Sequence, residues 1–265
     1  MKPPFEITPK ILRLLPELGK AIGVFEGVAI IKPDPQLRKR NAIRTIHSSL
    51  AIEGNTLSLD QVTTIFDNKK IVGPLREINE VKNAIRLYQQ ENKFRIYSEK
   101  DFLKAHDVLM NNLLESSGKY RTGNVGIIKG NKVKHVAPKA NHVAKLMNNL
   151  FAFIKNDRET PLPILSAIFH YEMEFIHPFD DGNGRMGRFW QHLLLKEYHE
   201  IFSVIPFETT IRDRQEDYYL VLSECDKAGD STKFIEFSLE VLIKSLRDTF
   251  AVYSQVTVRP EDRLL

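Results

Sequence analysis

One short stretch of the chain, HPFDDGNGRMGR at His177–Arg188, gathers residue types that bind phosphate groups. Its Gly-Asn-Gly segment at 182–184 leaves backbone N–H groups open to an anion, and the helix expected to begin there adds the positive end of its dipole. Arg185 and Arg188 are three residues apart and therefore project from one face of that helix, where both can hold phosphate oxygens. The stretch predicts an anion-binding cradle at a helix N-terminus.

Two other residues of this stretch suit chemistry on a bound phosphate. Asp181 comes just before the cradle, and its carboxylate offers the hard oxygen ligands that a phosphate-bridging Mg²⁺ prefers. His177 has an imidazole whose ordinary pKa suits proton transfer near neutral pH. Phe179, placed between these polar residues, is expected to be buried and to anchor the loop.

The same letters satisfy two other patterns that their context disfavours. Residues 182–187 read G-x-G-x-x-G, as in dinucleotide-binding folds, but that motif requires a preceding strand, and here the helix expected at Pro163–Phe175 precedes it. His170 and Glu174 lie one helical turn apart and with His177 suggest a zinc site. That set lacks the second closely spaced histidine of zinc-protease helices.

Helical periodicity dominates the elements that must position this stretch. The expected helices are Asp34–Glu53, Leu59–Phe66, Pro74–Glu91, Lys100–Leu114, His142–Lys155, Pro163–Phe175, Gly184–His199, Arg212–Asp226 and Thr232–Tyr253. The segment Asn124–Ala137 differs, because two short arms flank Gly130-Asn131, which is the signal of a two-residue β-hairpin. The sequence predicts one mainly α domain with a single β-hairpin on its surface.

Composition excludes several classes of protein. The 265 residues include 38 Lys and Arg against 34 Asp and Glu, a net charge of +4 without the concentrated basic stripe typical of nucleic-acid binding. The single cysteine, Cys225, excludes a disulfide framework and suits a reducing compartment. There is no apolar run of the ~18–20 residues that a membrane span needs, and the N-terminus does not resemble a signal peptide. We therefore expect a cytoplasmic protein that binds neither membrane nor nucleic acid.

The stretch His177–Arg188 resembles the signature of the Fic family, H-P-F-x-[D/E]-G-N-G-R-x-x-R, at every specified position. The resemblance implies a mainly α, Fic-type helical bundle in which the hairpin Asn124–Ala137 forms a flap over the active site. The corresponding domain boundaries are an N-terminal helical region at 1–97, a Fic catalytic core at 98–255 and a C-terminal tail at 256–265.

A second motif lies upstream of the signature. Ser49 begins the sequence SLAIEGN, which resembles the inhibitory motif of the family, [S/T]-x-x-x-E-[G/N]. In the family the glutamate of this motif, here Glu53, pairs with the second arginine of the signature, here Arg188. Such a pair would remove a cation from the γ-phosphate site and leave a negative charge there, so that ATP binds badly or in an unreactive pose.

The resemblance further implies that the protein is an adenylyltransferase, which transfers AMP from ATP to a Ser, Thr or Tyr hydroxyl of a target protein and releases pyrophosphate. His177 would be the base, Asp181 would hold Mg²⁺, and the hairpin would hold the target segment. The residues that would bind ATP and its phosphates are Gly182, Asn183, Gly184, Arg185 and Arg188. Family members often form homodimers, so a homodimer is also expected.

The purine side and the direction of the reaction leave room for alternatives. Tyr219 and Asp226 match the adenine-side region of the family, although asparagine is more usual at the position of Asp226. One alternative function is removal of AMP from a modified protein, in which Glu53 positions a water molecule. Another is a non-catalytic module that senses nucleotide through the cradle.

Overall fold

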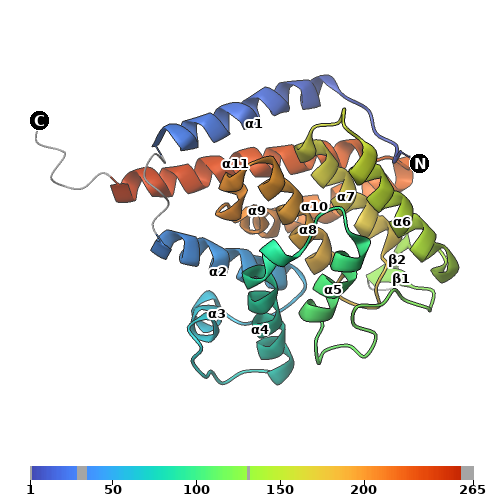
Figure 1. Ribbon diagram of the computed structural model, residues 1–265, viewed down its shortest axis with the longest axis horizontal. Helices are drawn as coiled ribbons and strands as arrows, with labels where there is room; N and C mark the ends of the chain where they lie inside the picture. The colour runs from blue at the N-terminus through green and yellow to red at the C-terminus, as the bar shows by residue number, and fades with distance from the viewer. Residues whose placement is uncertain (1, 29–34, 130–131, 258–265) are drawn as a thin grey trace, which may run out of the picture.

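The computed structural model describes residues 2–28, 35–129 and 132–257, and Figure 1 shows a bundle of helices. The helices are α1 (Pro9–Val28), α2 (Pro35–Ile52), α3 (Leu59–Phe66), α4 (Leu75–Gln89), α5 (Glu99–Leu109), α6 (Ala140–Asn156), α7 (Leu162–Ile176), α8 (Asn183–Tyr198), α9 (Phe207–Asp213), α10 (Gln215–Ala228) and α11 (Thr232–Thr257). Two 3₁₀ helices, η1 (Glu91–Lys93) and η2 (Glu200–Ser203), and two strands, β1 (Gly126–Lys129) and β2 (Lys132–Val136), complete the described elements.

Helices α7 and α8 form the centre of the core. Helix α7 is apolar on nearly all its faces, which is the pattern of a helix surrounded by others, and α6, α8 and α11 pack against it. Phe102, Phe169, Phe179 and Trp190 are fully buried between these helices, with ring centroids of Phe102 and Trp190 5.1 Å apart. The loop between α7 and α8, which carries the predicted phosphate-binding stretch, therefore joins the two helices at the centre of the core.

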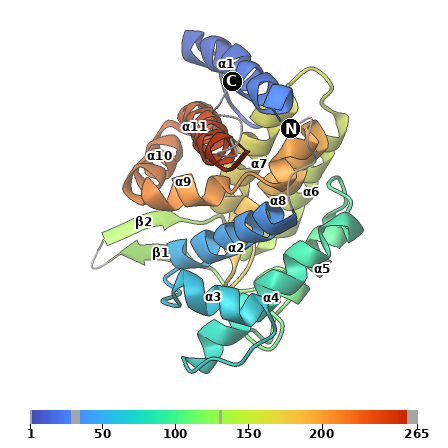
Figure 2. The same ribbon diagram turned by 90° about the vertical axis from the view of Figure 1, so that its left-hand side faces the viewer.

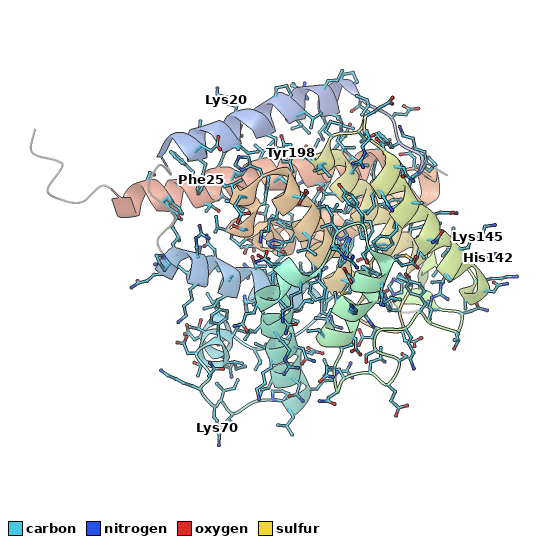
Figure 3. The ribbon with its side chains drawn as sticks, in the orientation of Figure 1. Lys20, Phe25, Lys70, His142, Lys145 and Tyr198 are labelled. Atoms are coloured by element: carbon cyan, nitrogen blue, oxygen red, sulfur yellow. The ribbon has the colours of Figure 1, made fainter. Side chains whose placement is uncertain are left out.

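The N-terminal helices lie against this core from two sides. Helix α1 runs along α11, and Phe25 near its end packs on Phe250 and Tyr253 (Figures 1 and 3). Helix α2 packs on α9 and α4 and also contacts α8. Helix α3 begins with a complete capping box between Ser58 and Gln61. Packing of α2 on α8 brings the end of α2 to the predicted phosphate-binding stretch.

Strands β1 and β2 pair antiparallel, with an irregularity in register between Ile127 and Ile128. Figure 2 shows the two strands extending from the side of the bundle, and β2 lies beside α10. The predicted turn at Gly130-Asn131 and residues 258–265 of the predicted tail fall outside the described residues. None of the described helices is long and apolar enough to cross a membrane.

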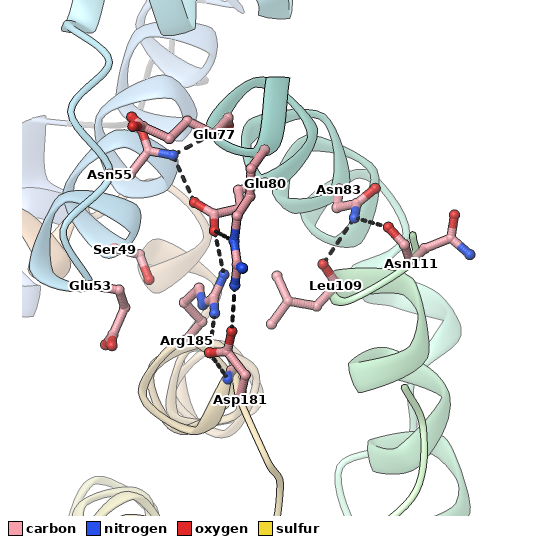
Figure 4. A network of polar contacts seen from close by, with 12 residues as sticks. Ser49, Glu53, Asn55, Glu77, Glu80, Asn83, Leu109, Asn111, Asp181 and Arg185 are labelled. Carbon is pink, nitrogen blue, oxygen red and sulfur yellow. Dashed lines mark hydrogen bonds and ion pairs between the residues drawn. The ribbon is translucent and has the colours of Figure 1, made fainter. Parts of the chain in front are cut away.

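The predicted mainly helical class is confirmed, and most predicted helices end within a few residues of the observed bounds. The helix predicted at Lys100–Leu114 is wrong at its end, because α5 stops at Leu109. The Asn83 side-chain amide donates to the carbonyls of Leu109 at 3.1 Å and Asn111 at 2.7 Å (Figure 4). An amide from α4 thus satisfies carbonyls that a continuing helix would have used.

The helix predicted at Arg212–Asp226 is also wrong at its start, because the chain breaks at Arg214 between α9 and α10. The guanidinium of Arg214 lies 4.8 Å from the ring centre of Phe237 and 3.4 Å from the carboxylate of Glu240, both on α11. Contacts of Arg214 with α11 fix the break between α9 and α10. The residues next to Arg214 include no helix breaker that would predict it.

Candidate active site

The loop between α7 and α8 is held by its own residues. Helix α7 ends at His177, which has left-handed backbone angles (φ 49°), and α8 is preceded by Gly182 at φ 87°. A Cβ at Gly182 would lie 2.9 Å from the sulfur of Met110, so the position requires glycine on grounds of both space and conformation. The Asn183 side chain donates to the carbonyl of Phe179 and accepts from its N–H, both at 2.9 Å. Phe179 is fully buried, as predicted.

A histidine outside the signature supports this loop. The His106 ring stacks on Phe179 with ring centres 3.6 Å apart, and its Nδ1 accepts from the N–H of Gly118 at 2.9 Å. The other nitrogen, Nε2, therefore carries the proton and donates to the carbonyl of Asp181 at 3.0 Å. Burial lowers the pKa of His106 to about 4, so the ring is neutral at neutral pH. His106 fixes the backbone from which the Asp181 carboxylate extends.

His106 is expected to make the protein sensitive to acid. Between pH 6.5 and pH 4 the unfolded chain binds a proton at this residue that the folded chain does not, so the free energy of unfolding falls as the pH falls. The expected loss at this residue is about 3 kcal/mol. Urea denaturation at several pH values should show a shallower pH dependence in His106→Gln, which does not titrate. Parallel curves for the two proteins would contradict the assignment.

The Arg121 side chain secures the C-terminal end of α7. Its buried guanidinium donates to four carbonyls, which belong to His177 (2.7 Å), Gly123 (2.8 Å), Pro138 (2.5 Å) and Ile176 (3.3 Å). Burial lowers the pKa of Arg121. Gly123 and Pro138 lie on either side of the β1–β2 segment, so one side chain ties His177 to both ends of the hairpin. The sequence analysis missed Arg121, because a lone arginine in a loop carries no local signal of such a role.

Replacing Arg121 with methionine is expected to lower the free energy of unfolding by about 3 kcal/mol or more, because buried carbonyls lose their donor. Arg121→Lys should recover only part of the loss, since an ammonium cannot match the fork of a guanidinium. Urea denaturation measures both, with the exposed Arg158→Met as the matched control. A midpoint unchanged from that of the control would show that Arg121 does not secure the loop.

The second arginine of the signature meets the end of α2. Arg188 is fully buried, and its Nη2 donates to Glu53 Oε1 at 2.7 Å and to the Ser49 carbonyl at 2.8 Å. Its Nε donates to the Ser49 hydroxyl at 3.1 Å. Burial opposes the positive charge, but the Glu53 carboxylate outweighs it and holds the pKa of Arg188 above its ordinary value. The structure thus shows the expected pair of Glu53 with Arg188 and adds Ser49 as a second partner of Arg188.

Glycine at position 184 lets the Glu53 carboxylate and the Arg188 guanidinium approach the backbone of α8. A methyl group there would collide with the Glu53 carboxylate and would lie 3.0 Å from Arg188 Nη1. That Nη1 is buried and makes no hydrogen bond within the described part of the chain. A buried guanidinium donor therefore faces a bare backbone at the start of a helix, where an anion's oxygen would satisfy it.

The first arginine of the signature, Arg185, forms ion pairs with two carboxylates outside the upstream motif. Arg185 Nη2 donates to Asp181 Oδ1 at 2.7 Å, and its Nη1 lies 3.8 Å from Glu80 Oε1 on α4. Asp181 Oδ2 accepts from Arg76 Nη2, also on α4, at 3.0 Å. Figure 4 shows Arg185 between Asp181 and Glu80, close to Ser49 and Glu53. Arg76 and Glu80 were not predicted, because an exposed Arg and Glu four apart on a helix usually form only a solvated pair.

The two residues expected on the adenine side lie on α10. The Tyr219 hydroxyl donates to the carbonyl of Ile52, the last residue of α2, at 3.3 Å, which places its ring beside the Glu53 end of the site. Asp226 lies two turns further along, where its Oδ1 accepts from Tyr171 at 3.2 Å. Within the described residues, no three His, Cys, Asp or Glu side chains are grouped as a metal-binding cluster.

Known proteins resemble this chain in sequence and in fold. The Fic/DOC family model matches residues 96–195. A protein adenylyltransferase Fic from Nematostella vectensis is 29% identical over 245 residues, which cover 86% of this chain. The crystal structure of a Fic family protein from Desulfovibrio desulfuricans G20 is 47% identical with a TM-score of 0.91, covering 98% of this chain and 79% of that one. Fic-1 (residues 134–508) from C. elegans, at 21% identity and a TM-score of 0.73, shares the fold over 93% of this chain and 74% of its own.

The match to curated relatives is partial on their side. The chain spans 55% of the length of the Nematostella protein and 42% of a protein adenylyltransferase Fic from Aedes aegypti, to which it is 27% identical. The match to the Desulfovibrio structure is nearly complete for this chain and extends over most of that protein. Identity, coverage, fold and the intact signature together show that the chain belongs to the Fic/DOC family.

Proposed function

We propose that this protein transfers AMP from ATP to a hydroxyl group of a target protein. The observation that carries the proposal is the cradle at the start of α8: Gly184 has no side chain, and the buried Nη1 of Arg188, which makes no hydrogen bond within the described residues, lies 3.0 Å from where a Cβ would stand. A triphosphate supplies the oxygens that such a site is built to hold. Relatives named protein adenylyltransferase support this choice over other phosphate ligands.

The residues of the loop then divide the reaction among them. His177 takes the proton of the target hydroxyl while its oxygen forms a bond to the α-phosphorus, and the bond from that phosphorus to the β-phosphate oxygen breaks. The developing negative charge is received by the backbone N–H groups of Asn183 and Gly184, since the Gly182 N–H donates to Asp181 and the Asn183 side-chain amide is engaged with Phe179. Arg185 and Arg188 hold the β- and γ-phosphates, which leave as pyrophosphate.

Asp181 suits a Mg²⁺ ion that arrives with the nucleotide. Its carboxylate is about a third exposed (36%) at the edge of the cradle and offers hard oxygen donors. Mg²⁺ is commonly bound through one or two carboxylates plus substrate phosphates, so a dedicated cluster of protein ligands is not required. When bound, the ion would neutralise phosphate charge.

The β1–β2 segment at 126–136 is proposed to hold the target. A strand edge can bind an extended peptide through main-chain hydrogen bonds, with little demand on its sequence. Arg121 bonds to carbonyls on both sides of this segment and to that of His177, so a target held there would lie close to the base. Tyr219, beside the end of α2, is proposed on the adenine side together with Asp226.

Glu53 is proposed to keep the site inactive. Its carboxylate occupies the side of Arg188 that would hold the γ-phosphate and stands over Gly184, where a phosphate would lie. A carboxylate there repels the triphosphate and competes for the guanidinium. Activation then requires the end of α2 to release Arg188.

The chemistry is tested by the position of the label in ATP. The Glu53→Gly protein is incubated with Mg²⁺ and a cell lysate, and labelling is counted as the excess over Glu53→Gly/His177→Ala in the same lysate, because lysate kinases use γ-labelled ATP. The excess should appear with α-labelled ATP and not with γ-labelled ATP. An excess with γ-labelled ATP alone would show phosphoryl transfer instead, and no excess with either would refute ATP as the substrate.

A further inference from the structure

The carboxylate expected to hold Mg²⁺ is already paired with two guanidinium groups. Asp181 Oδ1 accepts from Arg185 and from the N–H of Gly182 (2.6 Å), and Oδ2 accepts from Arg76. Arg185 belongs to the signature and is proposed above to bind the phosphates of ATP. Arg76 comes from α4, 105 residues away in the sequence, and nothing in the proposed reaction uses it. Its position on Oδ2 therefore needs a separate account.

Arg76 is placed by its neighbours on α4. Its Nε lies 3.5 Å from Glu80 Oε1, one turn along the same helix. Glu80 is only 14% exposed, and its Oε2 accepts from the Asn55 side-chain amide at 2.9 Å (Figure 4). Asn55 also donates to the carbonyl of Glu77 at 3.2 Å. The short segment that follows Glu53 thus fixes the carboxylate that orients Arg76 toward Asp181.

Arg76 nevertheless remains free to leave. Its side chain is 64% exposed, whereas that of Arg185 is 6% exposed. It is the second residue of α4, and Leu75 before it is 79% exposed. An exposed guanidinium on a helix end loses little when its ion pair opens, because water replaces the contact. Of the two cations on Asp181, Arg76 is the one that an incoming ion can displace.

We propose that Arg76 is a positioning residue that occupies the Asp181 carboxylate until Mg²⁺ arrives with the nucleotide, and so makes binding of ATP depend less on the metal. This inference rests on the adenylyl transfer proposed above. In the absence of metal, Arg76 neutralises Asp181 and spares the triphosphate its repulsion. In the presence of metal, Arg76 must first be displaced, which weakens binding of the Mg²⁺–ATP complex.

Arg76 is expected to strengthen ATP binding without metal and to weaken binding of Mg²⁺–ATP. These opposite signs distinguish the proposal from a purely structural role of Arg76. Removing Arg76 should tighten binding of Mg²⁺–ATP, since the ion no longer competes with a guanidinium. The same change should weaken binding of ATP in EDTA, since an uncompensated carboxylate then faces the phosphates. Each change should be about two- to fivefold, the range of an exposed ion pair. General loosening of the site would weaken both.

The test is calorimetric titration of ATP into Glu53→Gly and Glu53→Gly/Arg76→Ala, once with Mg²⁺ and once with EDTA. Glu53→Gly/Arg86→Ala is the matched control, because Arg86 is an exposed arginine near the other end of the same helix. Glu53→Gly/Asp181→Asn tests the carboxylate, and in it the effect of Mg²⁺ on the dissociation constant should shrink. None of these titrations requires transfer activity.

Opposite shifts in Arg76→Ala, absent in Arg86→Ala, are the expected result. Weaker binding under both conditions would overturn the proposal, because loss of a direct contact with the phosphates and general loosening of the site both give that result. Unchanged binding under both would overturn it too, and would leave Arg76 a surface ion pair. If Asp181→Asn keeps the full effect of Mg²⁺, the metal lies elsewhere, and the proposal fails whether or not labelled AMP is still transferred.

Discussion

Glu53→Gly is expected to raise the rate of AMP transfer by about 100-fold. The change frees the Arg188 guanidinium, which then serves as one preorganised donor to the triphosphate, and it removes a carboxylate from the space over Gly184. Initial rates of labelling with α-labelled ATP and Mg²⁺ measure this directly. Glu53→Gln should fall between the two proteins, because it removes the charge but keeps most of the side chain.

The same variant should be less stable than the native chain. Arg188 is fully buried, and loss of Glu53 removes its hydrogen-bonded carboxylate, so that among the described residues its remaining hydrogen bonds go to the Ser49 hydroxyl and carbonyl. The expected cost is about 2 kcal/mol, and Mg²⁺–ATP should recover part of it by binding only the folded state. Higher activity with lower stability is the signature of an inhibitory contact that also serves as a structural one.

Two controls make this result decisive. Glu115→Gly removes an exposed carboxylate in the turn after α5 and should change neither rate nor stability appreciably. A target protein already carrying labelled AMP distinguishes the reverse reaction: if the native chain releases AMP and Glu53→Gly does not, Glu53 serves AMP removal. Equal transfer by native and Glu53→Gly proteins would refute inhibition by Glu53.

His177→Asn, introduced into Glu53→Gly, is expected to lower transfer by about 10²- to 10⁴-fold through loss of the general base. Asparagine is the informative replacement, because His177 has left-handed backbone angles that asparagine tolerates better than alanine. The dissociation constant for ATP should change little, since in this account His177 touches the target hydroxyl and not the phosphates. Titration calorimetry checks that expectation.

The matched control is His142→Asn, which alters an exposed histidine on α6 at the edge of the molecule (Figure 3). Introduced into Glu53→Gly, it should leave the rate of AMP transfer equal to that of Glu53→Gly alone. Retention of more than about a tenth of the activity in His177→Asn would mean that another group, or water, takes the proton.

The sequence predicts well those features whose cause is local. The helix α7 with its apolar faces and the start of α8 at the Gly-Asn-Gly segment both follow from residues adjacent in the chain. The pairing of Glu53 with Arg188 was reached only through the resemblance to the Fic family. The residues are 135 positions apart, and neither carries a local sign of the other.

Features with a distant cause were missed. Helix α5 ends where an amide from α4 caps it, and the break at Arg214 is set by α11. His106 is buried, and its contact with the Asp181 carbonyl, 75 residues away in the sequence, has no local sign. Arg76 likewise pairs with Asp181, which lies in a loop 105 residues away in the sequence, so its role has no local sign.

The central claim is that an intact Fic signature, restrained by Glu53, transfers AMP to protein. The most direct measurement compares label incorporated from α-labelled ATP and Mg²⁺ by the native chain, Glu53→Gly and Glu53→Gly/His177→Ala, each with the same lysate. The account predicts strong labelling with Glu53→Gly, little with the native chain and none with the double variant. No labelling with any of the three, or equal labelling with all of them, would contradict it.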